Sequence, residues 1–319
     1  MLNRRILRIK AFKVLYSYAE NPQMSLKDAE AQLEMSCNSV RDLYLFMLSI
    51  IPAVTGVAKA RIEAARNKFN PTREELNPNM RFVENSISRI LLGDIDFQKI
   101  VGKTKLSWDQ YDVLLRKLYE DMCTKRWFID YMAKDSVTPA DEAAMFTKMY
   151  EEEFVDNEDL EAILEEISIW WNDDLAYALT WCCKTVSGLA AGERWALPAL
   201  YLSDIQKKPA SESDKAFVYN LLRAAYTGLG RYSEMISGTV PQWDRERLFT
   251  IDTMLIVCGL AEAQTFPEIP IKVTINEYVE ISKFYSTPKS RSFVNGILDR
   301  LIQQMVNEGK IVKSGKGLL

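Results

Sequence analysis

The stretch that decides the fold covers residues 245–301 and reads RERLFTIDTMLIVCGLAEAQTFPEIPIKVTINEYVEISKFYSTPKSRSFVNGILDRL. Its apolar residues recur three and four positions apart, which is the spacing of a helix that buries one face. Pro267 and Pro270 interrupt the pattern, and because proline cannot continue a helix, they separate one helix from the next. The pattern predicts three helices in this region: 243–264, 272–286 and 290–308.

The last two of these predicted helices each carry an apolar stripe that we expect to face the core. The stripes contain, in turn, Ile271, Ile275, Tyr278 and Tyr285, and then Val294, Ile297, Leu298, Leu301 and Met305. Asn276 and Asn295 stand among these apolar residues, so each needs a hydrogen-bond partner if it is buried. We interpret both as clamps between helices, and Gly296 as a position where two helices approach closely.

The rest of the chain gives the same helical pattern. Further helices are predicted over 3–19, 25–36, 39–51, 53–69, 81–92, 107–133, 139–153, 158–171, 174–190, 194–205, 213–228 and 231–237. No segment shows the sustained alternation of a half-buried strand. The 13 Gly and 11 Pro among 319 residues are also too few for the many turns of an all-β fold. The predicted fold class is all-α.

Two segments bear on how these helices are organised. Residues 43–58 (LYLFMLSIIPAVTGVA) carry no charge, but they are fewer than the ~20 residues that cross a bilayer. We therefore expect a buried core helix that is broken near Pro52. Residues 207–215 (KKPASESDK) are polar, contain Pro209 and offer Ser213 as a helix N-cap, which predicts a linker. The first residues lack the continuous apolar run of a signal peptide, so we expect a cytoplasmic protein.

The composition excludes several kinds of active site. The chain has no histidine, which removes Ser-His and Cys-His catalytic pairs and His-ligated zinc. Its 5 cysteines include no Cys-x-x-Cys pair, so we expect free thiols in a reducing compartment. Gly102-Lys103-Thr104 resembles the end of a phosphate-binding loop, but Phe97 stands where that loop needs a glycine. We expect no enzyme, no metal site and no cofactor.

Charge is unevenly distributed, although 40 Lys and Arg against 44 Asp and Glu give a net charge of only −4. Residues 151–174 contain many acids and no Lys or Arg, which we interpret as a solvated helix face. The first acid of the chain is Glu20. The cations that precede it are Arg4, Arg5, Arg8, Lys10 and Lys13.

These cations belong to a predicted helix that has two distinct faces. One is a core face, made of Leu7, Ala11, Val14, Leu15 and Tyr18. The other gathers Arg5, Ile9, Phe12 and Tyr16, with Arg8 at its border. Cations beside aromatic rings suit single-stranded RNA, because the charges pair with phosphates while a ring stacks on an unpaired base. Ordinary packing of Phe12 and Tyr16 is the alternative interpretation.

Four segments of the chain resemble one family. They are IPIKVTINEYVEISKF (269–284), SFVNGILD (292–299), the arginine-rich RRILRIKAFKVLYSY (4–18) and, with lower specificity, DKAFVYNLLRAAYTGLGRYSEMISG (214–238). These segments are similar to the NusB family of bacterial transcription antitermination factors. The resemblance covers residues 1–20 and 211–319. It implies an all-α fold of two small helical bundles that binds the boxA element of ribosomal leader RNA.

The resemblance also implies partners and site residues. In that family, RNA binding is shared with NusE, a small-subunit ribosomal protein, and the pair helps RNA polymerase to read through terminators. Asp252 matches an acidic position that faces NusE. Lys289 stands where the family usually has an acid, and a lysine there would add a phosphate contact. The residues expected to bind RNA are Arg4, Arg5, Arg8, Lys10, Tyr16, Phe284, Lys289 and Phe293.

The same resemblance divides the chain into three parts: a first helix (1–20), a helical insertion (21–210) and the remainder of the NusB-like domain (211–319). Trp170, Trp171 and Trp181 of the insertion are expected in its core. The leading hypothesis is a non-catalytic RNA-binding elongation factor, which requires the cations near Met1 to lie beside Phe284 and Phe293. The alternative is a protein-only helical scaffold whose insertion binds another protein and which has lost RNA binding.

Overall fold

Helices form wherever the apolar spacing is regular. The computed structural model describes residues 1–171, 173–207, 209, 213–239 and 251–318, and this described part holds helices and no strand. The predicted all-α fold class is confirmed. One isolated bridge joins Leu2 to Tyr201, where the Leu2 amide donates to the Leu200 carbonyl at 2.7 Å.

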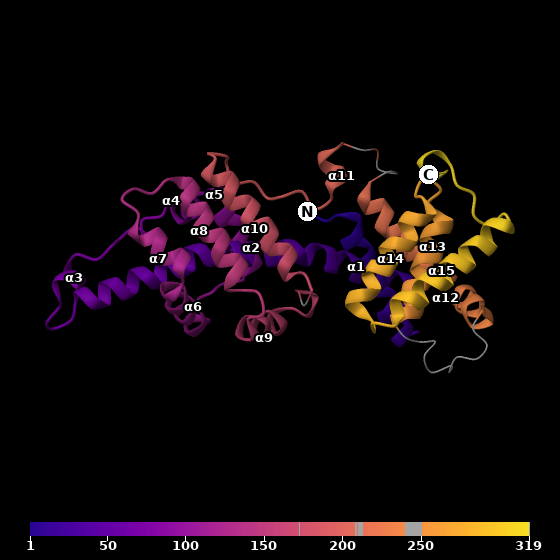
Figure 1. Ribbon diagram of the computed structural model, residues 1–319, viewed down its shortest axis with the longest axis horizontal. Helices are drawn as coiled ribbons and strands as arrows, with labels where there is room; N and C mark the ends of the chain where they lie inside the picture. The colour runs from indigo at the N-terminus through magenta and orange to yellow at the C-terminus, as the bar shows by residue number, and fades with distance from the viewer. Residues whose placement is uncertain (172, 208, 210–212, 240–250, 319) are drawn as a thin grey trace. The chain divides into compact units, whose positions relative to one another are not determined.

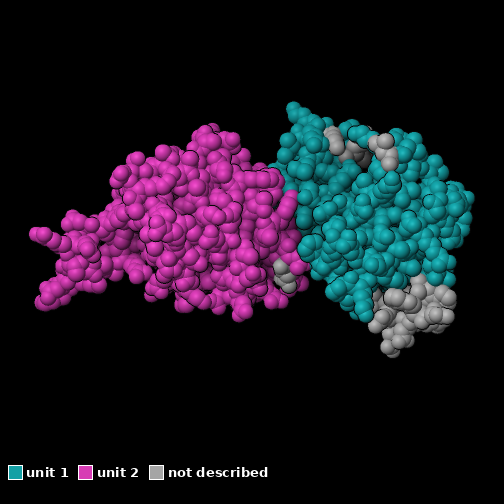
Figure 2. All heavy atoms as spheres, viewed as in Figure 1, with its two compact units in different colours: residues 1–37, 199–319 teal, residues 38–198 magenta. Residues whose placement is uncertain are grey.

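The chain divides into two compact units, coloured separately in Figure 2. Unit 1 contains residues 1–37 and 199–319, and unit 2 contains residues 38–198. The long helix α2 (Leu26–Arg66) begins in unit 1 and ends in unit 2. Unit 2 therefore falls within the segment 21–210 that the sequence sets apart.

Unit 1 is built around α13 (Ile251–Thr265), whose residues from Thr253 to Ala263 are all buried. This helix is apolar on nearly every side, as expected for a helix surrounded by others. The helices that pack against it are α1 (Arg4–Glu20), α12 (Asp214–Thr239), α14 (Ile271–Tyr285) and α15 (Ser290–Asn307), which appear together in Figure 1. The unit also contains α11 (Leu202–Ile205) and the short 3-10 helix η4 (Gly315–Leu318).

A glycine of α13 allows α14 and α15 to approach this central helix closely. A Cβ atom on Gly259 would lie 2.6 Å from Leu298 Cδ2 and 3.3 Å from a ring carbon of Tyr278, and both side chains are fully buried. Gly296, which the sequence suggested for this role, is exposed and has open space where a Cβ would lie. The interpretation of Gly296 as a close-approach site is therefore wrong.

Asn276 and Asn295 are also exposed, so their interpretation as buried clamps is wrong. Each asparagine follows a buried stripe residue, Ile275 or Val294, by one position. One step along a helix turns a side chain by about 100°, which takes both asparagines from the core to solvent.

The two glycines give a matched prediction about stability. We expect Gly259→Ala to lower the free energy of unfolding by about 1–3 kcal/mol, because the added methyl group overpacks a buried contact. Gly296→Ala should raise it by up to about 1 kcal/mol, because alanine is the better helix former and meets nothing. Urea denaturation followed by circular dichroism measures both changes. Equal midpoints for the two variants would contradict the assigned packing.

The described part of the predicted linker contains the expected N-cap. The Ser213 hydroxyl oxygen accepts a hydrogen bond from the Ala216 amide at 3.0 Å, which confirms that prediction. Residues 208 and 210–212 of the linker lie outside the described residues, and so do residues 243–250 of the helix predicted over 243–264.

Helix α2 continues through Pro52, so the predicted break there is wrong. Proline removes one backbone hydrogen bond and crowds the turn before it. Before that turn, side chains from other segments donate to two helix carbonyls: Trp108 Nε1 to Phe46 at 2.9 Å and the Tyr150 hydroxyl to Met47 at 3.0 Å. Ile50, Ile51 and Val54 on either side of Pro52 are fully buried, and this packing offsets the hydrogen bond that the proline removes. By length and composition α2 could also cross a membrane, but 61% of its most apolar window is buried, as in a core helix.

Unit 2 contains the helices that follow the second part of α2 in the chain. They are α3 (Arg73–Leu76), α4 (Ser86–Gly93), α5 (Ile95–Thr104), α6 (Asp112–Thr124), α7 (Arg126–Ala133), α8 (Pro139–Glu152), α9 (Glu158–Ile167), the 3-10 helix η1 (Ile169–Trp171) and α10 (Leu175–Ala190). Phe46 stacks on Trp108 with ring centres 4.0 Å apart. Trp171 is buried as expected, whereas Trp170 and Trp181 are only half-buried.

Candidate nucleic-acid interface

Helix α1 carries most of the cations that the sequence singled out. The Asn3 side chain caps its start by accepting from the Ile6 amide at 3.0 Å. The predicted core face is buried at Leu7, Ala11, Val14 and Leu15, while Tyr18 is half-buried and stacks on Tyr226 of α12. This packing against α12 and α13 fixes which way each cation of α1 points.

Arg8 lies inside unit 1, not on its surface. Its side chain is 4% exposed, and its Nε and Nη2 donate to the two carboxylate oxygens of Glu262 at 2.7 and 2.8 Å. Thr274 and Tyr278 also donate to Glu262, at 2.9 and 3.3 Å. Burial opposes the charge of Arg8, but the Glu262 carboxylate outweighs burial and raises the pKa of the guanidinium. Arg8 therefore ties α1 to α13 and α14.

Arg4 and Arg5 are nearer to solvent, and each is paired with an acid. Arg4 Nε lies 3.3 Å from Asp214 Oδ1, and its guanidinium lies 4.8 Å from the centre of the Phe217 ring. Arg5 Nε and Nη2 donate to Glu277 of α14 at 2.9 and 2.8 Å. The hydrogen bond from Arg5 lowers the pKa of Glu277 and raises that of Arg5, so both groups stay charged.

The remaining candidates of α1 are divided between interior and surface. Lys10 is only 2% exposed, and Phe12 is buried with its ring edge-on to Tyr285, ring centres 5.7 Å apart. Lys13 is half-buried with its Nζ 5.4 Å from the centre of the Tyr285 ring, a cation–π distance. Tyr16 is half-buried. Lys10, which the resemblance places among the RNA-binding residues, is therefore buried, and Phe12 has the packing role of the alternative interpretation.

The most exposed aromatic of unit 1 among the predicted site residues is Phe284, near the end of α14. Its side chain is 80% exposed, whereas Phe293 of α15 is half-buried. Lys289, the N-cap residue of α15, and Arg291 in its first turn are both exposed. Arg291 interacts electrostatically with Glu280, which lies one helical turn before Phe284. We call Phe284, Lys289 and Arg291 the corner patch.

One face of α14 connects the corner patch to α1. Glu277, Glu280 and Phe284 follow one another at three- and four-residue spacing, so they share this face. Arg5 pairs with Glu277, so it lies about two helical turns, roughly 10 Å, from Phe284 along the helix. The structure brings Arg5 to the same helix face as Phe284, while it buries Arg8 and Lys10. Sequence reasoning missed Glu262, Glu277, Glu280 and Arg291.

Asp252 lies in the first turn of α13 and is half-buried. Its Oδ1 atom is buried and has no hydrogen-bond partner among the residues that the structure describes. A buried carboxylate oxygen without a partner is energetically costly. The position is therefore one where a donor from outside this described part would be favourable.

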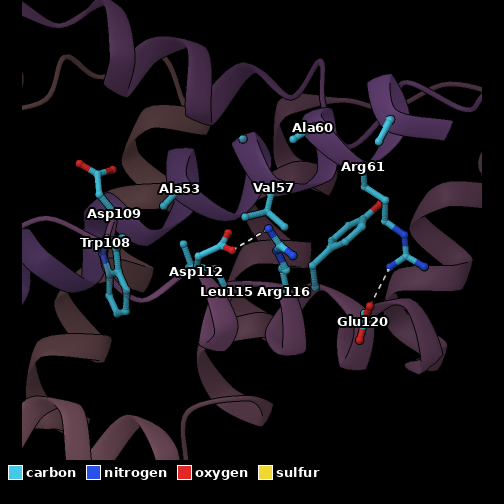
Figure 3. Close-up of a pocket in the computed structure, with 13 residues that line it drawn as sticks. Ala53, Val57, Ala60, Arg61, Trp108, Asp109, Asp112, Leu115, Arg116 and Glu120 are labelled. Carbon is cyan, nitrogen blue, oxygen red and sulfur yellow. Dashed lines mark hydrogen bonds and ion pairs between the residues drawn. The ribbon is translucent and has the colours of Figure 1, made fainter. Parts of the chain in front are cut away.

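Unit 2 contains a different feature, a cleft of about 760 Å³ between α2 and the segment 108–120 (Figure 3). Small residues line its α2 side at Ala53, Gly56, Ala60 and Ala64. The charges at its rim pair with each other, Arg116 with Asp112 at 2.7 Å and Arg61 with Glu120 at 3.5 Å. No group of three metal-ligating residues occurs anywhere in the described chain.

Comparison with known proteins finds relatives that match part of the chain. The family model described as "NusB family" matches residues 190–303, which include α11 to α14 and most of α15. The transcription antitermination protein NusB of Salinibacter ruber is 33% identical over 124 residues, 39% of this chain and 76% of that protein. The NusB proteins of Chloroherpeton thalassium and Thermodesulfovibrio yellowstonii are each 35% identical, over 105 and 96 residues. These matches span 33% and 30% of this chain, and 50% and 64% of the relatives. No solved structure matches the chain.

Proposed function

The chain belongs to the NusB family, and we propose that it acts as a transcription antitermination factor that binds boxA-type single-stranded RNA of ribosomal leader transcripts. It does so without catalysis, together with NusE, within the elongating RNA polymerase complex. The observation that carries the RNA-binding proposal is the corner patch, in which a highly exposed ring is followed, five and seven residues later, by exposed cations. An unpaired base stacks on such a ring while the cations neutralise its flanking phosphates.

The candidate residues take different roles in this proposal. Phe284 provides the stacking surface, and Lys289 and Arg291 provide phosphate contacts. Arg5 extends the surface along α14, and Arg4, Tyr16 and Phe293 form its margins. Arg8 and Lys10 support the surface from inside, since both are buried.

NusE is proposed to bind next to the first turn of α13. The buried Oδ1 of Asp252, which lacks a partner in the described part of the chain, would accept a hydrogen bond from a donor of NusE. We propose the limits of the helical insertion at 21–210 on the resemblance, and none of the proposed RNA-binding residues belongs to that segment. Most acids of its 151–174 segment are exposed, and their charge would repel RNA.

A specific observation favours the second candidate function, a protein-only scaffold. The arginines of α1 are already paired with Asp214, Glu277 and Glu262, which leaves α1 less able to attract RNA. In that case the corner patch would bind no RNA, and the binding surfaces would be the insertion and the NusE site.

Titration of a labelled boxA oligonucleotide with the full chain separates the two functions. If about four phosphates are neutralised, the logarithm of the affinity should fall against the logarithm of the salt concentration with a slope of roughly −3. We expect tighter binding when NusE is added, and weaker binding to a scrambled sequence. Equal, weak binding of both oligonucleotides with and without NusE would favour the scaffold.

A further inference from the structure

We propose that Glu277 restrains RNA binding by occupying the guanidinium of Arg5, a control that rests on the proposed RNA-binding function of the same surface. The two residues form a bidentate pair, in which Arg5 Nε and Nη2 donate to the two oxygens of Glu277 at 2.9 and 2.8 Å. Such a pair uses the same planar donors that would grip a phosphate.

The exposure of the pair distinguishes it from the neighbouring buried one. The Arg5 and Glu277 side chains are 49% and 19% exposed, whereas those of Arg8 and Glu262 are 4% and 0% exposed. Opening the buried Arg8–Glu262 pair would leave both charges without a partner and without water. The Arg5–Glu277 pair can open toward solvent, so a phosphate can compete with Glu277 for Arg5.

The position of Glu277 makes this competition relevant to the corner patch. Glu277 lies on the face of α14 that also carries Glu280 and Phe284. Arg8 Nη1, at 3.5 Å, adds a second cation that holds the carboxylate in place. A strand stacked on Phe284 and extended toward α1 would meet a fixed negative charge beside Arg5. Glu277 therefore weakens phosphate binding in two ways. Its negative charge repels the phosphate, and it occupies the Arg5 donors that the phosphate would use.

A second arginine–glutamate pair supplies a matched control. Glu30 of α2 pairs with Arg223 of α12, and their side chains are 24% and 51% exposed, close to the values for Glu277 and Arg5. Removing the charge of Glu30 changes the net charge of the protein as much as removing that of Glu277. Only the change at Glu277 alters the proposed RNA surface.

Binding of a labelled boxA oligonucleotide to the full chain at several salt concentrations tests the proposal. We expect Glu277→Gln to bind about two- to fivefold more tightly than the unmodified chain, the size of an exposed ion pair. Its salt slope should become steeper by up to about 0.7, because one more phosphate is neutralised on single-stranded RNA. Glu30→Gln should bind as the unmodified chain does. The gain in RNA affinity from Glu277→Gln should disappear when Arg5→Ala is added, because the freed Arg5 guanidinium is what produces that gain.

Thermal unfolding of each variant accompanies these titrations, because Glu277 also contacts Arg8. Glu277→Met, which keeps the side-chain length without charge, replaces Glu277→Gln if the latter unfolds. The proposal is overturned if a folded Glu277 variant binds RNA as tightly as the unmodified chain or more weakly. Glu277 would then position Arg5 without restraining RNA binding. If the unmodified chain itself does not distinguish boxA from a scrambled oligonucleotide, the proposed function fails, and this inference fails with it.

Discussion

Replacing Glu262 with leucine is expected to lower the free energy of unfolding by about 3–5 kcal/mol, because the charge of Arg8 then stays buried without its partner. Glu262 is fully buried and accepts from Arg8, Thr274 and Tyr278. One carboxylate thus joins α1, α13 and α14. Urea denaturation followed by circular dichroism measures the loss, which is the largest that we expect from any single change in unit 1.

A double replacement is the control for this effect. Arg8→Met combined with Glu262→Leu removes both charges, and we expect it to regain much of the stability lost in Glu262→Leu, because no unpaired charge remains. Glu30→Leu breaks an exposed pair and should cost no more than about 1 kcal/mol. A urea midpoint for Glu262→Leu equal to that of Glu30→Leu would contradict the structural role assigned to Arg8.

Replacing Phe284 with alanine is expected to weaken binding of boxA RNA by about ten- to a hundredfold, because it removes a stacking contact of ~1–3 kcal/mol per base. The ring is 80% exposed, so its loss should leave the thermal unfolding temperature nearly unchanged. Fluorescence anisotropy with a labelled oligonucleotide measures the affinity. A loss of affinity without loss of stability identifies a contact surface and not a packing defect.

Phe69 in unit 2 offers the matched control, since its side chain is 99% exposed and lies far along the chain from the corner patch. Phe69→Ala removes the same ring, and we expect it to leave RNA affinity unchanged. Equal affinities for Phe284→Ala and the unmodified chain would remove the corner patch from the RNA surface.

The sequence predicts the frame of unit 1 well, because α14 and α15 each bury a regular apolar stripe and α13 is apolar on nearly every side. The stripe residues Tyr278, Val294 and Leu298 are buried as expected. The helix Ile95–Thr104 of unit 2 was missed, although Asp94 is a recognisable N-cap whose side chain accepts from the Phe97 amide at 2.9 Å. The uninterrupted course of α2 through Pro52 depends on tertiary packing, since Ile50, Ile51 and Val54 on either side of the proline are fully buried, and the sequence of α2 alone does not show what covers them.

The candidate site was harder to predict, because partners distant in sequence decide which cations of α1 remain accessible. Arg8 and Glu262 are 254 residues apart, and the pattern of α1 alone contains no sign of that pair. One signal was present in α13, where Glu262 is the only acid in the apolar run 253–263. A buried carboxylate needs a cation or several donors, and this requirement points to an arginine elsewhere in the fold.

Photo-crosslinking to a boxA oligonucleotide that carries 4-thiouridine tests most directly the claim that the corner patch holds single-stranded RNA. After digestion with trypsin, Phe284 and Lys289 lie in one peptide, FYSTPK (284–289). The account predicts that mass spectrometry finds the crosslinked nucleotide on this peptide, and that an unlabelled boxA competitor removes it. Crosslinks confined to residues 38–198, with FYSTPK unmodified, would contradict it.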